Sequence, residues 1–158
     1  MGAEAIFKTL GAARGFFLKT ITDLNDEQLL EIPEGFNNNV LWNVGHILYA
    51  HCGMTYRPCG VELPIPDSYT DLFKGGSSPS DWSETPPISE VMELFKAPGK
   101  QIQTDYAAGK FENYNKVDLF DGYALENIEE ALGFNIFHES IHVSTVGKMV
   151  KALNAVKA

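Results

Sequence analysis

The chain has 158 residues, which predicts one domain, residues 1–158, with a core large enough to fold without disulfides. Its 12 basic and 21 acidic residues leave a net charge of −9, which opposes binding to nucleic acid or to an anionic membrane, so neither is an expected partner. Two cysteines, no apolar run of membrane-spanning length and no charged-then-apolar leader after Met1 predict a cytoplasmic protein with reduced thiols.

The first predicted element is an amphipathic helix over residues 3–22, where apolar residues are spaced by three and four. Its basic residues Lys8, Arg14 and Lys19 are expected to face solvent. A short helical turn should follow Asn25, because this residue and Gln28 have the spacing of a capping box.

A second long helix is predicted over residues 39–57, with N-caps offered by the asparagines at 37–39. It is apolar nearly all round, so we expect it to be buried. Proline, glycine and serine then interrupt every period over residues 58–82, which predicts a long crossover.

A third helix is predicted over residues 87–108, with Thr85 as its N-cap. Pro98 lies in its middle and should kink or split it, because proline lacks the amide donor and clashes with the preceding turn. The fourth helix is predicted over residues 125–155.

No clean period-two strand and no internal repeat is visible in the sequence, so the predicted fold class is all-α. Four helices with one long crossover between the second and the third predict a four-helix bundle. Bundles of this kind build metal sites from side chains on facing helices, so the histidines on these helices are candidate ligands.

An H-E-x-x-H pattern runs from His138 to His142 in the fourth predicted helix. Residues four apart are about 40° apart around a helix and one turn apart along it, so both imidazoles can bind one metal ion. Burying two unpaired rings in this otherwise apolar stripe would cost roughly 1–3 kcal/mol each, which a shared metal removes. Zinc proteases use the same pattern but take a later third ligand, and residues 143–158 contain no His, Cys, Asp or Glu. An ordinary zinc protease is therefore disfavoured.

His46 is the best candidate for the third ligand, because its neighbours on the helix face are mainly apolar and should pack inward. His51 lies about 140° further round the same helix and is expected to be partly exposed or to stand behind the ligands. Three histidines with an open position are typical of a catalytic zinc, whereas a structural zinc normally has four protein ligands. Zinc or nickel is the expected ion, with iron and manganese as alternatives.

Glu139 is the candidate catalytic residue, since it lies about 100° from His138, beside the metal stripe. It could act as a base on a metal-bound water or accept a proton from a ligand imidazole; the alternative is a solvated or interhelical glutamate. Cys52 is expected to be a plain core residue. For Cys59, in a loop, a reactive thiol and a fourth ligand are the functional alternatives to an ordinary residue.

Three segments, in order along the whole chain, carry a resemblance to a known family: L-W-N-V-G-H-I-L at 41–48, F-K-G-G-S-S-P at 73–79 and E-E-A-L-G-F-N-I-F-H-E-S-I-H at 129–142. They resemble the DinB/YfiT-like superfamily of small bacterial four-helix metalloproteins. The resemblance implies an up-down-down-up bundle, frequent homodimers and a role in stress responses. It also implies that the metal is held by His46, His138 and His142.

The resemblance further implies metal-dependent transfer of a low-molecular-weight thiol, such as bacillithiol, mycothiol or glutathione, to an electrophile, or isomerisation through a thiol adduct. The leading hypothesis is therefore a metal-dependent thiol transferase whose partners are a small thiol and an electrophile. A second hypothesis is a hydrolase that uses metal-bound water with Glu139 as base. The third is a non-catalytic module that binds a metal or a small ligand.

Overall fold

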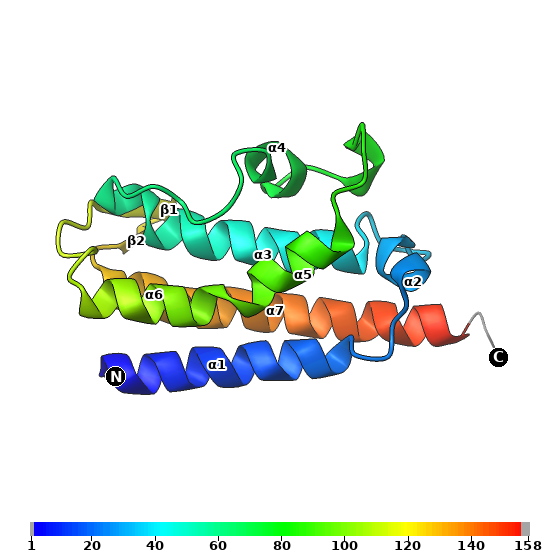
Figure 1. The fold of residues 1–158 in the computed structure, drawn as a ribbon, viewed down its shortest axis with the longest axis horizontal. Helices are drawn as coiled ribbons and strands as arrows, with labels where there is room; N and C mark the ends of the chain where they lie inside the picture. Colours follow the sequence, from blue (N-terminus) through cyan, green and yellow to red (C-terminus); the bar gives the residue numbers. More distant parts are fainter. Residues whose placement is uncertain (1, 156–158) are drawn as a thin grey trace.

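The computed structural model describes residues 2–155 and is mainly helical (Figure 1), so the predicted helical class is confirmed. The longest helix, α7 (Ile128–Ala155), packs against both α1 (Ala3–Thr20) and α3 (Val40–Thr55). Within the described part of the chain, no helix combines the length and the apolar character that crossing a bilayer would require.

Two consecutive helices, α5 (Ile88–Lys96) and α6 (Pro98–Ala107), replace the single third helix of the prediction. The predicted split at Pro98 is confirmed. Helix α5 contacts α3, whereas α6 contacts α1, so the pair borders both α1 and α3. The N-cap predicted at Thr85 is wrong, because Pro86 precedes another proline and favours extended backbone, which delays the start of α5.

Side-chain caps fix where the early helices begin. The predicted capping box is confirmed at α2 (Asp26–Leu30): the Asn25 side chain accepts from the Gln28 amide at 2.9 Å, and the Gln28 side chain accepts from the Asn25 amide at 3.3 Å. Asn39 caps α3 by accepting from the Trp42 amide at 2.7 Å, and it also donates to the last carbonyl of α2 at 3.0 Å. The start of α3 is therefore tied to its neighbour.

A small antiparallel hairpin lies between α6 and α7, formed by β1 (Val117–Phe120) and β2 (Tyr123–Leu125). The prediction of a chain without strands is wrong here, because strands this short do not show a clear period of two. The turn contains Gly122 at φ +73°, a left-handed conformation that glycine adopts without strain. The hairpin also delays α7, which begins three residues later than the predicted residue 125.

The predicted crossover between α3 and α5 contains short helical segments rather than only loop: η1 (Arg57–Cys59), α4 (Tyr69–Phe73) and η2 (Pro79–Asp81). Helix α4 lies over α3 (Figure 1). The approach is close because α3 has a glycine, Gly45, below Phe73, and a Cβ at this position would overlap the Phe73 ring.

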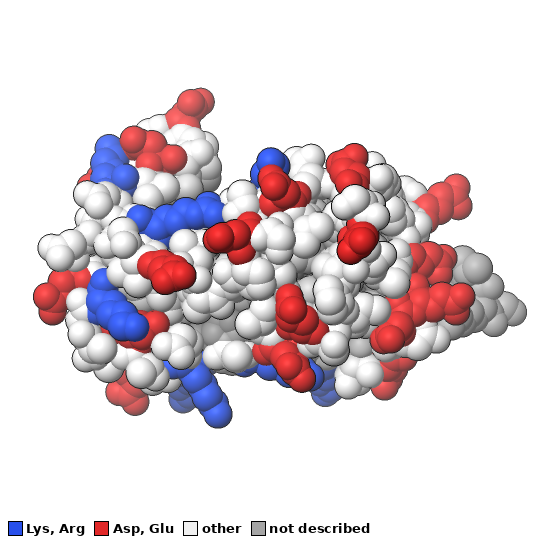
Figure 2. Space-filling model, turned by 45° about the horizontal axis from the view of Figure 1, so that its top comes forward, with Lys and Arg blue, Asp and Glu red and all other residues white. Residues whose placement is uncertain are grey.

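Charged side chains lie mainly on the surface, and Figure 2 shows acidic ones spread over one face with fewer basic ones between them. The core contains apolar residues from α1, α3, α5 and α7, and α3 is the most buried of these helices, as its sequence predicted. Some polar or charged residues are nevertheless buried, among them His51, Asn135 and Glu139. Buried polar groups need hydrogen-bond partners, so these residues are the first place to look for a functional site in the interior.

Candidate metal centre

The three histidines predicted as metal ligands lie together between α3 and α7. One ring nitrogen from each of His46, His138 and His142 can be chosen so that all three atoms lie within 4.8 Å of one another. The Nε2 atoms of His46 and His138 are 3.3 Å apart. All three rings are partly buried, and they come from two helices whose contact sets their spacing.

The orientation of His46 is set by the crossover. Its Nδ1 lies 2.7 Å from the carbonyl oxygen of Phe73, and because a carbonyl can only accept, Nδ1 donates and Nε2 keeps its lone pair. Trp42, one turn earlier on α3, stacks on the ring at 4.6 Å between centroids and 8° between planes. A hydrogen bond from the second ring nitrogen, like that of Nδ1 to the Phe73 carbonyl, is the usual way in which a metal-binding histidine is oriented.

His142 is oriented in the same way by Asn43. The Nδ1 atom of His142 lies 2.8 Å from Asn43 Oδ1, while the amide nitrogen of Asn43 donates to the Asn39 carbonyl at 2.8 Å. His142 therefore also keeps Nε2 free for a metal. His138 differs, since its buried Nδ1 has no partner within residues 2–155.

The electrostatics keep these imidazoles neutral. Burial, together with the neighbouring imidazoles, lowers the pKa of His138 to about 4 and that of His142 to about 3. Burial also lowers the pKa of His46, although its hydrogen bond to Phe73 acts in the opposite direction. Neutral imidazoles bind a metal without first losing a proton, so this donor set fits a divalent ion.

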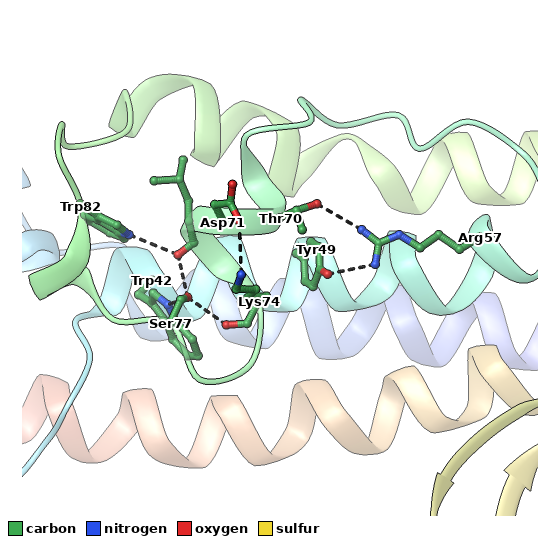
Figure 3. Close-up of polar contacts among 9 residues, drawn as sticks. Trp42, Tyr49, Arg57, Thr70, Asp71, Lys74, Ser77 and Trp82 are labelled. Carbon is green, nitrogen blue, oxygen red and sulfur yellow. Dashed lines mark hydrogen bonds and ion pairs between the residues drawn. The ribbon is translucent and has the colours of Figure 1, made fainter.

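The crossover is fastened to α3 at Trp42, the residue that stacks on His46. Figure 3 shows the bonds around Trp42. The Trp42 indole donates to the Ser77 hydroxyl at 3.0 Å, and that hydroxyl lies 2.9 Å from the carbonyl oxygens of Leu72 and Lys74. The Trp82 indole also donates to the Leu72 carbonyl, at 3.2 Å. These bonds hold the segment that presents the Phe73 carbonyl to His46.

A second attachment lies further along α3 (Figure 3). Arg57 donates to the hydroxyl of Tyr49 at 2.9 Å and to the hydroxyl of Thr70 at 3.2 Å. Its guanidinium also lies 4.8 Å from the centre of the Tyr49 ring. Helix α4 is thus attached through Thr70 to Arg57, as well as through Ser77 to Trp42.

Glu139 lies in a different environment from the histidine group, to which it does not belong. It is fully buried, and its two oxygens accept from Arg14 of α1 at 2.8 and 3.1 Å. Arg14 also donates to the Phe95 carbonyl and lies 3.8 Å from the centre of the Phe95 ring. The prediction that Arg14 faces solvent is therefore wrong. These are the contacts of an interhelical ion pair, and the catalytic role of Glu139 stays a prediction.

His51 is buried, at 3% exposed, so the expectation that it is partly exposed is wrong. Its Nδ1 lies 3.4 Å from Nη2 of Arg14. Burial and then the Arg14 charge hold the pKa of His51 well below its usual value. It therefore belongs with Arg14 and Glu139 rather than with the three ligands.

The cysteines stand apart from the histidine group. Cys52 is a buried core residue, as predicted, and burial raises the pKa of its thiol to about 12. Burial also raises the pKa of Cys59, which is partly buried. Both thiols are therefore protonated near neutral pH, which makes them poor nucleophiles.

Sequence reasoning missed the residues that orient the ligands. Asn43 was detectable as a polar residue one turn before His46 on an otherwise apolar helix. The Phe73 carbonyl was not detectable, because backbone carbonyls carry no sequence signal. The ion pair of Arg14 with Glu139 was not detectable either, since a cation on an amphipathic helix normally faces solvent.

Comparison with known proteins identifies the family. The model of the DinB superfamily matches residues 9–146, a span that contains all three histidines and the residues that orient them. None of the curated proteins compared with the chain matches it.

Proposed function

We propose that this chain, which belongs to the DinB superfamily, is a metal-dependent transferase that activates a low-molecular-weight thiol of the bacillithiol type for attack on an electrophile. The observation that carries the proposal is the group of His46, His138 and His142. Three protein ligands leave a coordination position open, whereas a structural zinc site normally fills all four with protein atoms. Zinc or nickel is the proposed ion.

A divalent ion held by these residues would lower the pKa of an added thiol, so that thiolate predominates near neutral pH. The chain's own contribution is to keep its imidazoles neutral and oriented. The Phe73 carbonyl does this for His46, and Asn43 does it for His142. Trp42 covers one face of the His46 ring and limits the access of water to it.

The reacting sulfur has to come from a small molecule, because neither cysteine of the chain is suited to the role. Cys52 is buried, with a thiol pKa of about 12, and neither it nor Cys59 belongs to the histidine group. No contact within residues 2–155 favours a hydrolase with Glu139 as base, since Arg14 engages both of its oxygens.

The proposal extends to the architecture and the assembly. We propose that α1, α3, the α5–α6 pair and α7 form an up-down-down-up four-helix bundle within a single domain, and that the protein is a cytoplasmic homodimer. The contacts of α7 with α1 and α3, of α5 with α3 and of α6 with α1 support the bundle. The family membership supports the dimer.

Turnover of monochlorobimane with cysteine, glutathione or bacillithiol tests the transferase. The expected result is a rate that disappears when a chelator removes the metal and returns when zinc or nickel is added. His142→Ala should lose both bound metal and rate. His51→Asn is the matched control, because an asparagine oxygen can still accept from Arg14 while the histidine group is untouched.

Two outcomes would overturn parts of the proposal. A metal-loaded protein with no metal-dependent rate for any thiol would overturn the transferase and favour a non-catalytic module. Metal content that stays unchanged in His46→Ala, His138→Ala and His142→Ala would overturn the site itself.

A further inference from the structure

A cavity of about 320 Å³ lies between α1 and α6, and none of the three histidine ligands lines it. Its walls are mainly apolar, with Phe7, Leu10 and Leu18 from α1 and Ile102 from α6. Cavities of this size and character are the usual sites of small organic ligands in proteins. The proposed transferase makes no use of this cavity, so it calls for a separate explanation.

The charged residues that line the cavity are all cations. Arg14, Lys96 and Lys100 line it, and no carboxylate does, although the chain as a whole has a net charge of −9. Lys96 and Lys100 are exposed and form no ion pair with any residue in the range 2–155. Glu139, which neutralises Arg14, is buried behind it. The cavity is therefore complementary to an anion.

Arg14 is held rigidly at the cavity wall. Its Nε and Nη2 donate to Glu139, Nη2 also faces His51 Nδ1, and Nη1 donates to the Phe95 carbonyl. Nη1 carries two hydrogens, and the second has no partner in the described part of the chain. The Arg14 side chain lines the cavity and is 13% exposed, so a ligand in the cavity would contact this side chain.

His51 provides a second observation at the same cavity. It lines the cavity and is 3% exposed, and its Nε2 has no partner within residues 2–155. Because Nδ1 faces a guanidinium, which can only donate, Nε2 carries the hydrogen. Buried donors without partners are rare in proteins, so the wall of this cavity contains an unsatisfied donor next to Arg14.

Two glycines keep the cavity open. Gly11 and Gly15 lie one turn apart on α1 and both line the cavity. Glycine within a helix is less stable than alanine, and a Cβ built at either position meets no atom within 4 Å. Close packing therefore does not require glycine at these positions, but larger side chains would fill the space.

We propose that this cavity binds a small organic carboxylate with an apolar tail. The carboxylate lies near Arg14 and the two lysines, and the tail lies along Phe7, Leu10 and Leu18. An inorganic anion would leave these apolar walls in contact with water, which makes it a poorer match. The site is separate from the metal centre and goes beyond the proposed transferase.

Titration of the zinc-loaded protein with octanoate, followed by NMR, tests the proposal. The amide signals of Gly11, Gly15 and Gly99 report on the cavity, and that of Gly147, which does not line it, serves as a reference. Octanoate should shift the three cavity signals and leave Gly147 unchanged. Octanamide has the same length without the charge, and it should bind at least about tenfold more weakly, because hydrogen bonds to charged groups are the stronger ones.

Variants separate the cavity from other surfaces. Gly11→Leu should fill the cavity and weaken octanoate binding at least about tenfold. Gly147→Leu is the matched control, a second helical glycine with open space around it, and it should leave binding unchanged. Lys96→Gln and Lys100→Gln should each weaken binding about two- to fivefold, as expected for exposed charges.

Three results would overturn the inference. Equal affinity for octanoate and octanamide would show that the site does not recognise the carboxylate. If Gly11→Leu keeps both its melting temperature and its octanoate binding, octanoate does not bind in this cavity. A wild-type dimer that Gly11→Leu converts to monomer, with no octanoate binding in either protein, would show that a second copy of the chain occupies this surface.

Discussion

At the scale of single residues, the side chains behind the metal ligands matter as much as the ligands. Asn43 accepts from His142, and the Phe73 carbonyl accepts from His46. Each contact selects the tautomer whose Nε2 lone pair is available to a metal. Among the residues that the structure describes, His138 Nδ1 has no such contact, so the orientation of the group depends on the other two rings.

Asn43→Leu should therefore weaken metal binding by about ten- to a hundredfold, since loss of a hydrogen-bond partner behind a ligand has effects of that size. Asn43→Asp is the matched control, because a carboxylate oxygen can still accept from His142 and should keep most of the affinity. Competition with a chelator of known affinity measures both. Equal affinities for the Leu variant and the wild type would contradict this role of Asn43.

The Arg14–Glu139 pair leads to a prediction about stability. Arg14→Met leaves a fully buried carboxylate without its partner and should cost about 3–5 kcal/mol of unfolding free energy. Combining it with Glu139→Leu removes both charges and should recover most of that loss. Denaturant unfolding measures the difference. A metal-dependent rate that survives in the double variant would exclude Glu139 as a catalytic base.

At the scale of elements, the crossover connects the fold with the site. Helix α4 approaches α3 over Gly45, and the crossover is held by the bonds around Ser77. One result of this packing is the contact between the Phe73 carbonyl and His46. The crossover is therefore part of the metal centre and not only a connection between helices.

Gly45→Ala tests this link, because its methyl group would overlap the Phe73 ring. Such crowding in a packed core typically costs about 1–3 kcal/mol, and the displaced crossover should also weaken metal binding. Thermal melting and metal competition measure the two effects. Gly147→Ala, at a helical glycine with open space, is the control and should be neutral or slightly stabilising. A normal affinity in the Gly45 variant would contradict the link.

At the scale of the whole molecule, the buried histidines make stability depend on pH. The folded protein holds His138 and His142 neutral, with pKa values of about 4 and about 3, whereas the unfolded chain protonates them near 6.5. Between these values the unfolded state binds more protons, so the unfolding free energy rises with pH. The stabilisation is complete above about pH 6.5 and is lost as the pH falls through the lowered pKa values.

Denaturant unfolding of the metal-free protein between pH 7 and pH 4 should therefore show a steady loss of stability on acidification. His142→Ala should flatten this dependence, because one of the two titrating rings is removed. Adding zinc at neutral pH should raise the melting temperature of the wild type and not that of the variant, because a ligand that binds only the folded state stabilises it. A flat pH profile for the wild type would contradict the account.

Much of the fold was predictable wherever one stretch of chain is enough to determine the outcome. The box at Asn25, the split at Pro98 and the helical class depend on backbone bonding within a few residues. The hairpin at residues 117–125 was missed because its strands are too short for a period to appear. Because the hairpin was missed, the start of α7 was predicted three residues too early.

The sequence by itself determined that His138 and His142 share one face of a helix, because residues four apart always do, and that Glu139 lies about 100° from His138, beside that face. Only the tertiary structure decided what each face meets: α3 with His46 on one side of α7, and α1 with Arg14 on another. Periodicity defines angles within one helix but not how that helix is rotated against its neighbours. That rotation follows from the summed packing of distant segments, which also places the Phe73 carbonyl and the cationic cavity.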